Sequence, residues 1–329
     1  MMYPVISVLI PVYKAEQYIA KCLDSCLSNS MAAFCEFIIV DDCSPDKSIE
    51  RAKSVVENYP YLKNNFVWLR HGINKGVAAS RNTALSNAHG TFIANVDADD
   101  WVEPMYFEQL YKKATEDNAD IVICNYFEEN GKKSKSKLGW NKKNDSDALI
   151  DLVSNSITGY LWNKLLRKSV IETYKIQFAQ NINIWEDFLF LFKIFSFSKK
   201  TTFLKQALYH YRKTPGTSIT QNFTPEKYSQ ILDTLFLVKA FSIEKNLYTR
   251  IRESYLQRSV VTKIIHIGKL PLQNRNYENF FTDEECSFVM KESKNGISKV
   301  FVVLIIHRVY FIVDFIFFVF SIVRGWGGV

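Results

Sequence analysis

The chain has little of what marks fibrous, linker-like or disulfide-stabilised proteins. It carries 12 glycines and 8 prolines among 329 residues, which excludes a collagen-like or linker-like chain. Six cysteines include no CxxC pair and no Cys/His grouping with zinc-ligand spacing. Hydrophobic residues make up 47%, enough to bury a sizeable core, so general disorder is also excluded.

Strong charge is likewise missing, and the sequence predicts no signal peptide. Lys and Arg number 41 against 34 Asp and Glu, a net charge of +7. This mild, dispersed excess favours anionic surfaces over a nucleic-acid groove. The N-terminus has no basic segment before its first apolar run and no small-residue cleavage site, so it predicts a β-strand rather than a signal peptide. Together with the unpaired cysteines, this indicates a reducing, cytoplasmic compartment.

Short apolar runs alternate with segments of helical spacing in the first hundred residues. The runs at 5–12, 37–40, 66–69 and 91–96 predict buried strands, and helices are expected between them. Alternation of this kind is typical of crossover units on a parallel sheet. The sequence therefore predicts an α/β fold with a mostly parallel sheet flanked by helices.

The rest of the chain gives weaker patterns. Two further strands are expected, and a Lys-rich segment predicts a surface loop. The remaining apolar segments predict helices. These strands are 121–126 and 207–211, the loop is 131–144, and the helices are 163–173, 185–197 and a set within 225–292.

Acidic residues follow two of the predicted strands. Asp41 and Asp42 end the second strand, and Asp97, Asp99 and Asp100 follow the fourth. Ligands of such sheets bind beyond the carboxyl ends of the strands. Three neighbouring carboxylates are tolerated when solvated or when a divalent cation neutralises them, and Mg²⁺ or Mn²⁺ prefers such oxygen ligands. The alternative is a polar turn that caps the next helix.

Two other segments carry candidate chemistry. Gly76 permits a tight turn before a helix, where Arg81 and the helix start would favour a phosphate; the alternative is an ordinary loop–helix junction. Glu186 and Asp187 precede a very apolar helix. Partial burial would raise the pKa of Asp187, as a general base requires. The alternative is a helix N-terminus stabilised by negative charge.

These segments, in this order, resemble the inverting nucleotide-sugar glycosyltransferases of family 2, which have the glycosyltransferase A fold. The resemblance covers residues 4 to about 220. One position departs from the family pattern, since Lys14 follows Tyr13. The matching segments are 5–13, 38–44, 74–82, 97–100 with Pro104, 162–165, 185–187 and 209–212 through Ser218.

The resemblance implies roles for individual residues. Asp187 would be the catalytic base. Asp99, with Asp97, would ligate a Mn²⁺ or Mg²⁺ ion bridging the diphosphate of the donor. The residues that would bind the nucleotide sugar, with UDP as the commonest carrier in the family, are Pro11, Tyr13, Asp41, Asp42, Arg81, Asp97, Arg212 and Ser218.

The implied function is inverting, metal-dependent transfer of a sugar to a hydroxyl of a glycan or lipid-linked glycan, in cell-surface polysaccharide synthesis. A catalytically silent nucleotide-sugar-binding scaffold at the membrane is the alternative, and the intact Asp97, Asp99 and Asp187 argue against it. A nucleotidyltransferase would need a Gly-rich basic loop after the first strand, which residues 11–16 do not supply. No nucleic-acid partner is expected.

The segment 300–323 is the most apolar part of the chain. Nineteen of its 24 residues are Phe, Ile, Val or Leu, and a single helix of that length would extend about 36 Å. His307, Asp314 and Ser321 would form one polar stripe along it. The helix could pack on the protein's own core or a partner subunit, and a homo-oligomer stays open. We favour contact with the inner face of the cell membrane, peripheral or anchored.

The domain organisation predicted from these features has three parts. A catalytic domain spans 1–222, a helical extension 223–295, and a membrane-associated segment 296–329.

Overall fold

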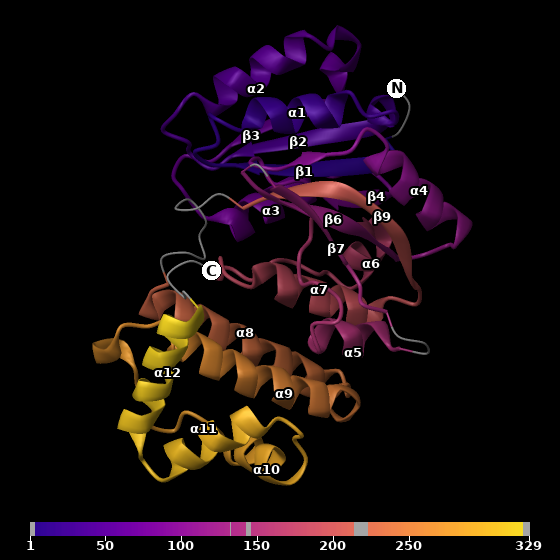
Figure 1. Cartoon of the computed structure of the whole chain (residues 1–329). Helices are drawn as coiled ribbons and strands as arrows, with labels where there is room; N and C mark the ends of the chain where they lie inside the picture. Colours follow the sequence, from indigo (N-terminus) through magenta and orange to yellow (C-terminus); the bar gives the residue numbers. More distant parts are fainter. Residues whose placement is uncertain (1–3, 132, 143–145, 214–222, 325–329) are drawn as a thin grey trace. The chain divides into compact units, whose positions relative to one another are not determined.

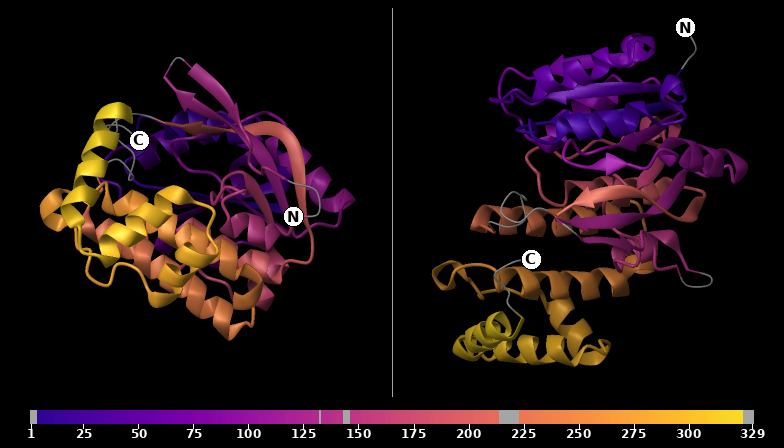
Figure 2. Two further views of the ribbon diagram at one scale, coloured as in Figure 1. Left: turned by 60° about the horizontal axis from the view of Figure 1, so that its bottom comes forward. Right: turned by 45° about the horizontal axis from the view of Figure 1, so that its top comes forward.

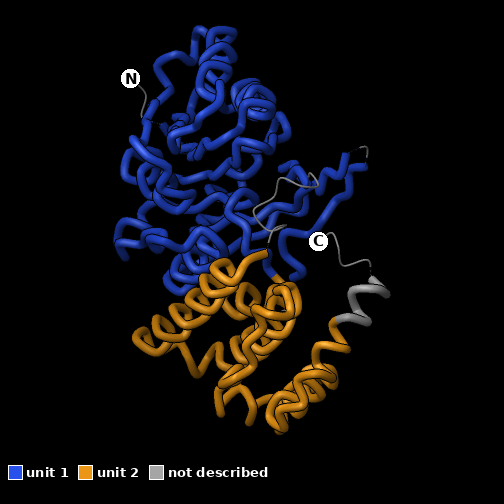
Figure 3. Tube along the Cα trace, turned by 90° about the vertical axis from the view of Figure 1, so that its left-hand side faces the viewer, with its two compact units in different colours: residues 1–148, 157–213 blue, residues 149–156, 214–329 orange. Residues whose placement is uncertain are grey.

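The computed structural model describes residues 4–131, 133–142, 146–213 and 223–324, with side chains up to residue 317 (Figure 1). The chain divides into two compact units. One contains residues 1–148 and 157–213, and the other contains 149–156 and 214–329 (Figure 3). The domain boundaries predicted near 222 and 295 stay predictions.

The first unit is built on a mixed sheet with the order β3-β2-β1-β4-β8-β6-β9-β5, and β7 pairs with β6. Its first four strands are parallel to one another, as the buried apolar runs predicted. Ile6 lies opposite both Cys35 and Phe92 in this register. The strands are β1 (Ile6–Val12), β2 (Cys35–Asp41), β3 (Phe66–Arg70) and β4 (Phe92–Asn95).

Helices cover both faces of these strands (Figures 1 and 2). The main hydrophobic core lies on one face, where alternate residues such as Val8 and Phe37 pack with Leu23, Ala52 and Phe107. These three belong to α1 (Ile19–Leu27), α2 (Ser48–Glu57) and α4 (Tyr106–Glu116). The helix α3 (Val77–Ser86) contacts β1 and β2 and lies on the opposite face in Figure 1.

The other half of the sheet mixes directions. The strand β8 (Lys164–Arg167) is antiparallel to β4 and to β6 (Ile121–Asn130). The strand β9 (Thr201–Arg212) is parallel to β6 and antiparallel to β5 (Trp101–Val102). The strands β4, β6 and β9 run in the same direction, and β8 runs in the opposite one. The carboxyl ends of β4, β6 and β9 therefore lie at the same edge of the sheet as the residues that precede β8.

Two local predictions were wrong in this half. The helix predicted over 163–173 is β8 followed by α6 (Lys168–Thr173); pairing with two neighbouring strands overrides the local helical pattern. The Lys-rich segment predicted as a loop contains β7 (Lys133–Lys137), which forms a hairpin with β6. Its alternating Lys and Ser side chains carry no apolar signal.

The predicted last strand is longer than expected, and α7 (Glu186–Phe197) matches its prediction. Short 3₁₀ helices span Ala32–Phe34 and Pro60–Asn65.

The second unit is helical. A partly buried ion pair joins two of its helices, because Lys263 Nζ donates to Glu285 Oε2 at 2.7 Å, and Glu285 also closes a capping box with Thr282. Arg258 donates to the carbonyls of Leu152 and Val153. The helices are α5 (Ala148–Val153), α8 (Pro225–Glu244), α9 (Tyr248–Ile267), α10 (Asp283–Lys291), α11 (Gly296–Ile306) and α12 (Tyr310–Arg324), with a 3₁₀ turn at Leu272–Asn274.

The single helix predicted over 300–323 was wrong, because the segment forms α11 and α12. Arg308 between them has φ of 57°, a left-handed conformation that a continuous helix does not allow. Asp314 on α12 accepts from Arg275 Nη1 and from the Tyr277 hydroxyl, both at 2.7 Å. Within the described part of the chain, none of the helices combines the length and the apolar character that a bilayer crossing requires.

Candidate active site

A buried arginine joins carboxylates that lie far apart in the sequence. Arg81 stands on α3 and is 3% exposed. Its Nη1 donates to Glu186 Oε1 at 2.7 Å and to Asp187 Oδ1 at 2.5 Å. Its Nη2 donates to Asp97 Oδ1 at 2.9 Å. One guanidinium therefore holds the residues that follow β4 against the first turn of α7.

Opposing effects set the pKa of the Asp187 carboxyl group. Burial raises its pKa, the Arg81 charge lowers it and the Glu186 charge raises it, which leaves the pKa at about 7. The Leu161 amide donates to its second oxygen, Oδ2, at 3.4 Å. A carboxyl group with a pKa near neutrality is partly ionised at physiological pH and accepts a proton readily, as a general base must.

The loop that carries the Leu161 amide is held by a buried lysine. Lys164 is fully buried, and its Nζ donates to the carbonyls of Thr158 and Tyr160 at 2.8 and 2.6 Å and to Asn163 Oδ1 at 2.7 Å. Burial lowers the pKa of Lys164 to about 7. These three acceptors fix the backbone beside Asp187.

The three aspartates after β4 have different surroundings. Asp100 is buried and accepts from the Tyr209 hydroxyl at 2.8 Å and from the Arg212 amide at 2.7 Å, so its part is structural. Asp99 is exposed, yet the protein around it and the Asp97 charge raise its pKa to about 6. Burial raises the pKa of Asp97 as well.

The chemistry of Asp97 and Asp99 fits a divalent cation. Mg²⁺ in proteins is often held by one or two carboxylates together with substrate phosphates. A cation would also favour the ionised state that burial and like charge disfavour here. Among the residues that the structure describes, no group of three or more His, Cys, Asp or Glu is arranged to hold a metal ion. The two aspartates would therefore supply part of a coordination shell, and a bound diphosphate the remainder.

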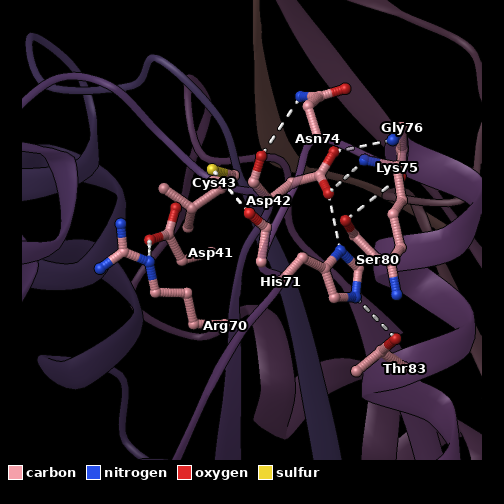
Figure 4. Close-up of polar contacts among 12 residues, drawn as sticks. Asp41, Asp42, Cys43, Arg70, His71, Asn74, Lys75, Gly76, Ser80 and Thr83 are labelled. Carbon is pink, nitrogen blue, oxygen red and sulfur yellow. Dashed lines mark hydrogen bonds and ion pairs between the residues drawn. The ribbon is translucent and has the colours of Figure 1, made fainter.

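Asp41 and Asp42, at the end of β2, are both engaged by the protein (Figure 4). The Asp42 carboxylate accepts from the amides of Lys75 and Gly76 at 2.9 and 2.8 Å and contacts His71 Nδ1 at 2.6 Å. Asp41 is buried, accepts from the Ser44 amide at 2.8 Å and forms an ion pair with Arg70 at 3.2 Å. Asp42 thus fixes the loop that leads into α3. Nucleotide contacts by either residue stay a prediction.

The remaining predicted donor residues lie at the same edge of the sheet or outside the described residues. Pro11 is near the end of β1, and Tyr13, just beyond it, is 45% exposed. Arg212 Nε donates to the Asp99 carbonyl at 2.8 Å, and its guanidinium lies 5.0 Å from the Trp101 ring centroid. Ser218 lies outside the described residues.

The structure also gives roles to residues that sequence reasoning did not assign. Lys164 belongs to a segment that matched the family pattern without a role, and here it clamps the loop beside Asp187. Glu186 shares Arg81 with Asp187. A lysine within a mostly apolar segment, residues 160–166, was the sequence signal for the clamp, because a buried lysine requires partners.

The strand order of this mostly parallel sheet, with helices on both faces, is that of the glycosyltransferase A class of folds. The chain belongs to glycosyl transferase family 2, whose family model matches residues 7–175. It is a glycosyltransferase.

Individual relatives agree with this membership, and solved structures share the fold. EpsH of Bacillus subtilis, named as a glycosyltransferase, is 35% identical over 250 residues, covering 74% of this chain and 70% of EpsH. The minor teichoic acid biosynthesis protein GgaB of Bacillus subtilis is 30% identical over 290 residues, covering 84% of this chain but only 31% of GgaB. S. aureus TarS 1-349, solved with UDP-GlcNAc, has a TM-score of 0.58 and 18% identity, covering 83% of this chain and 82% of TarS 1-349.

A more distant structure shares the fold. The mannosyltransferase PcManGT of Pyrobaculum calidifontis, solved with GDP-Man and Mn²⁺, has a TM-score of 0.53 and 12% identity, covering 96% of this chain and 87% of that one.

Proposed function

We propose that the protein transfers a sugar, with inversion, from a nucleotide-sugar donor to a hydroxyl of a glycan or lipid-linked glycan in cell-surface polysaccharide assembly. The observation that carries the proposal is the set of contacts that Arg81 makes with Asp97, Glu186 and Asp187, which we call the Arg81 junction. It brings Asp187 and Asp97 to the same guanidinium. UDP is the favoured carrier, supported by the UDP-GlcNAc complex of TarS. The teichoic acid role in the name of GgaB supports a cell-surface polymer as acceptor.

Asp187 is the base in this proposal. Its carboxylate removes the proton from the acceptor hydroxyl as that oxygen attacks the anomeric carbon. The bond to the diphosphate breaks on the opposite face of the sugar, so a single displacement inverts the configuration. Arg81 and the Leu161 amide hold the carboxylate in one orientation before the reaction, which reduces the cost of positioning it.

The donor is proposed to bind along the ends of β1, β2 and β4. Pro11 and Tyr13 would line the nucleotide pocket, Asp41 and Asp42 would contact the base or ribose, and Arg212 would lie near the diphosphate. Asp97 and Asp99 would hold Mn²⁺ or Mg²⁺, and the bound cation would neutralise charge on the departing diphosphate. Ser218 stays a predicted donor contact.

The proposed function is tested by a screen of nucleotide sugars. The purified chain is incubated with UDP-, GDP- and dTDP-sugars in the presence of Mn²⁺ or Mg²⁺, and release of the nucleoside diphosphate is measured. We expect release from at least one donor, faster with a cation than with EDTA. Nucleotide-sugar binding without any turnover would instead support the silent scaffold.

Removing Asp99 should uncouple donor binding from the cation. In the native protein we expect Mn²⁺ to strengthen UDP binding at least about tenfold, because a cation held by Asp99 would offset the repulsion between the carboxylates and the diphosphate. With Asp99→Ala, calorimetry should give a weak UDP affinity that is the same with and without Mn²⁺. Glu57→Ala, at an exposed position of α2, is the control. A full Mn²⁺ effect in Asp99→Ala would remove Asp99 from the metal site.

We further propose that α11 and α12 contact the inner face of the membrane. Ile297, Val300, Val303 and Ile306 recur at three-residue spacing on α11 and are 37–62% exposed. Phe311 and Phe315 on α12 are 74% and 63% exposed. Arg308, between the two helices, is exposed as well. Apolar side chains beside basic ones are the composition of an interfacial surface on anionic lipid.

Flotation with lipid vesicles tests this contact. The native chain should float with phosphatidylglycerol vesicles and much less with phosphatidylcholine. The double variant Phe311→Ser, Phe315→Ser should lower the partition coefficient at least about tenfold, because each exposed Phe can transfer apolar area into lipid. Phe236→Ser, at a position of α8 that is 69% exposed, is the matched control. Equal flotation of the double variant and the native chain would contradict the proposal.

A further inference from the structure

Beside the carboxylate cluster the first unit carries an aromatic surface, which we call the aromatic platform: Tyr160 and Tyr211 resting on Trp162. The Trp162 ring stacks on Tyr160 at 4.8 Å and on Tyr211 at 5.4 Å, within 12° of parallel in both cases. The two tyrosine centroids are 5.9 Å apart. Trp162 is 2% exposed, whereas Tyr160 is 40% exposed and Tyr211 is half-buried. Two tyrosine rings, whose planes are inclined at 23° to each other, therefore form a surface that solvent reaches.

The platform is rigid. Buried Tyr209 stacks on Trp162 at 4.5 Å, and Tyr126 meets Trp162 edge-on at 4.8 Å. The Tyr160 carbonyl accepts from buried Lys164. Packing around Trp162 and the hydrogen bond to the Tyr160 carbonyl thus hold the rings in place. A ligand that stacks on them would therefore lose little affinity to the ordering of side chains.

The platform lies near both the proposed base and the proposed metal ligands, because the Asp187 charge acts on Tyr160 and the charges of Asp97 and Asp99 act on Tyr211. Tyr160 directly precedes Leu161, whose amide donates to Asp187. Tyr211 directly precedes Arg212, which donates to the Asp99 carbonyl. Burial raises the pKa of Tyr160, and the charges of Glu128 and Asp187 raise it further, which agrees with this proximity. A sugar on the platform would have its hydroxyls near the base.

Resting on the proposed glycosyltransferase function, we propose that Tyr160 and Tyr211 are the acceptor subsite: they bind one face of the pyranose ring that carries the attacking hydroxyl. The C–H groups on that face are apolar and match an aromatic surface. The phenol groups of Tyr160 and Tyr211 make no hydrogen bond to any described residue, so both can bind hydroxyls of the sugar.

The position of the aromatic platform in the sheet favours the acceptor sugar, rather than the donor sugar, as its ligand. The donor nucleotide is proposed at the ends of β1 and β2, and Asp97 and Asp99 follow β4. The platform belongs to β9 and to the residues before β8, beyond β4 in the strand order. A pyranose there lies across the carboxylates from the nucleotide, as an attacking sugar would in an in-line displacement.

The test measures glycoside binding directly. Methyl β-glycosides of glucose, galactose, mannose and N-acetylglucosamine are titrated into the full chain with UDP and Mn²⁺, and binding is followed by saturation-transfer NMR. We expect at least one to bind, with the strongest transfer to C–H protons on one face of the ring. Tyr160→Ala should raise its Kd about tenfold, because it removes a stacking surface, whereas Tyr160→Phe, which keeps the ring, should change it less than about threefold.

Separate readouts distinguish the possible failures. Absence of binding by all four glycosides, or equal binding by Tyr160→Ala and the native chain, would overturn the subsite. A loss of affinity for the UDP-sugar but not for UDP in Tyr160→Ala, with glycoside binding intact, would assign the rings to the donor sugar and also overturn it. Tyr211→Ala is the second variant in case Tyr160→Ala does not fold, as judged by near-ultraviolet circular dichroism. Failure of the nucleotide-sugar screen would contradict the proposed function, whatever the glycosides do.

Discussion

Asp187→Asn is expected to lower kcat about 10²–10⁴-fold, the usual contribution of a general base, while the Kd for UDP changes less than about twofold. The amide keeps the size of the carboxyl group and an oxygen for Arg81, but it cannot take the proton of the acceptor hydroxyl. Steady-state transfer rates and UDP calorimetry on the same preparation separate the two effects. Near-normal turnover by Asp187→Asn would exclude it as the base.

Glu186→Gln is the matched control for this variant. It removes a neighbouring carboxylate that also binds Arg81, but not the proposed base, so kcat should fall far less. The Glu186 charge helps to raise the pKa of Asp187. Its loss should therefore move the acid limb of the pH–rate profile to lower pH, because Asp187 then stays ionised in more acidic solution.

Arg81→Met is expected to lower the free energy of unfolding by about 3–5 kcal/mol, the usual result of leaving buried charges without a partner. The substitution removes the counter-charge of Asp97, Glu186 and Asp187 while filling a similar volume. Urea unfolding followed by fluorescence measures the loss. Arg81→Lys, which keeps the charge but not the two-pronged donor geometry, should lose less.

The pH dependence of this loss has a definite sign. Without Arg81, the pKa values of Asp97 and Asp187 should rise further above their unfolded values. The folded state then binds more protons than the unfolded state, so the stability of the variant increases as the pH falls. The difference between Arg81→Met and the native chain should therefore shrink from pH 8 to pH 5. A difference independent of pH would mean that lost packing, rather than uncompensated charge, causes the instability.

The sequence could predict those parts of the site that follow directly from strand order. Buried apolar runs identified β1 to β4, and the positions of Asp97 and Asp99 after β4 followed from them. The partners of Arg81 could not be predicted, because an arginine one turn into a helix is equally typical of a solvated face. Only the tertiary structure brings Glu186 and Asp187 to its guanidinium.

The features that the sequence predicted wrongly, or not at all, also depend on long-range contacts. The four residues of β8 form a strand because β4 and β6 lie on either side, while their own pattern also suits a helix. The break at Arg308 contains neither glycine nor proline, so local propensity gave no warning of it. The aromatic platform joins residues from two distant segments, and each tyrosine alone reads as ordinary core.

The Arg81 junction has a consequence for synthesis on the ribosome. Its contacts span 16 residues to Asp97 but 105 and 106 residues to Glu186 and Asp187. A nascent chain that has not yet emerged past α7 therefore has a guanidinium on α3 with one of its three counter-ions. The centre proposed for catalysis is completed only when α7 arrives, and the same event supplies the last two hydrogen-bond partners of the guanidinium that α3 buries.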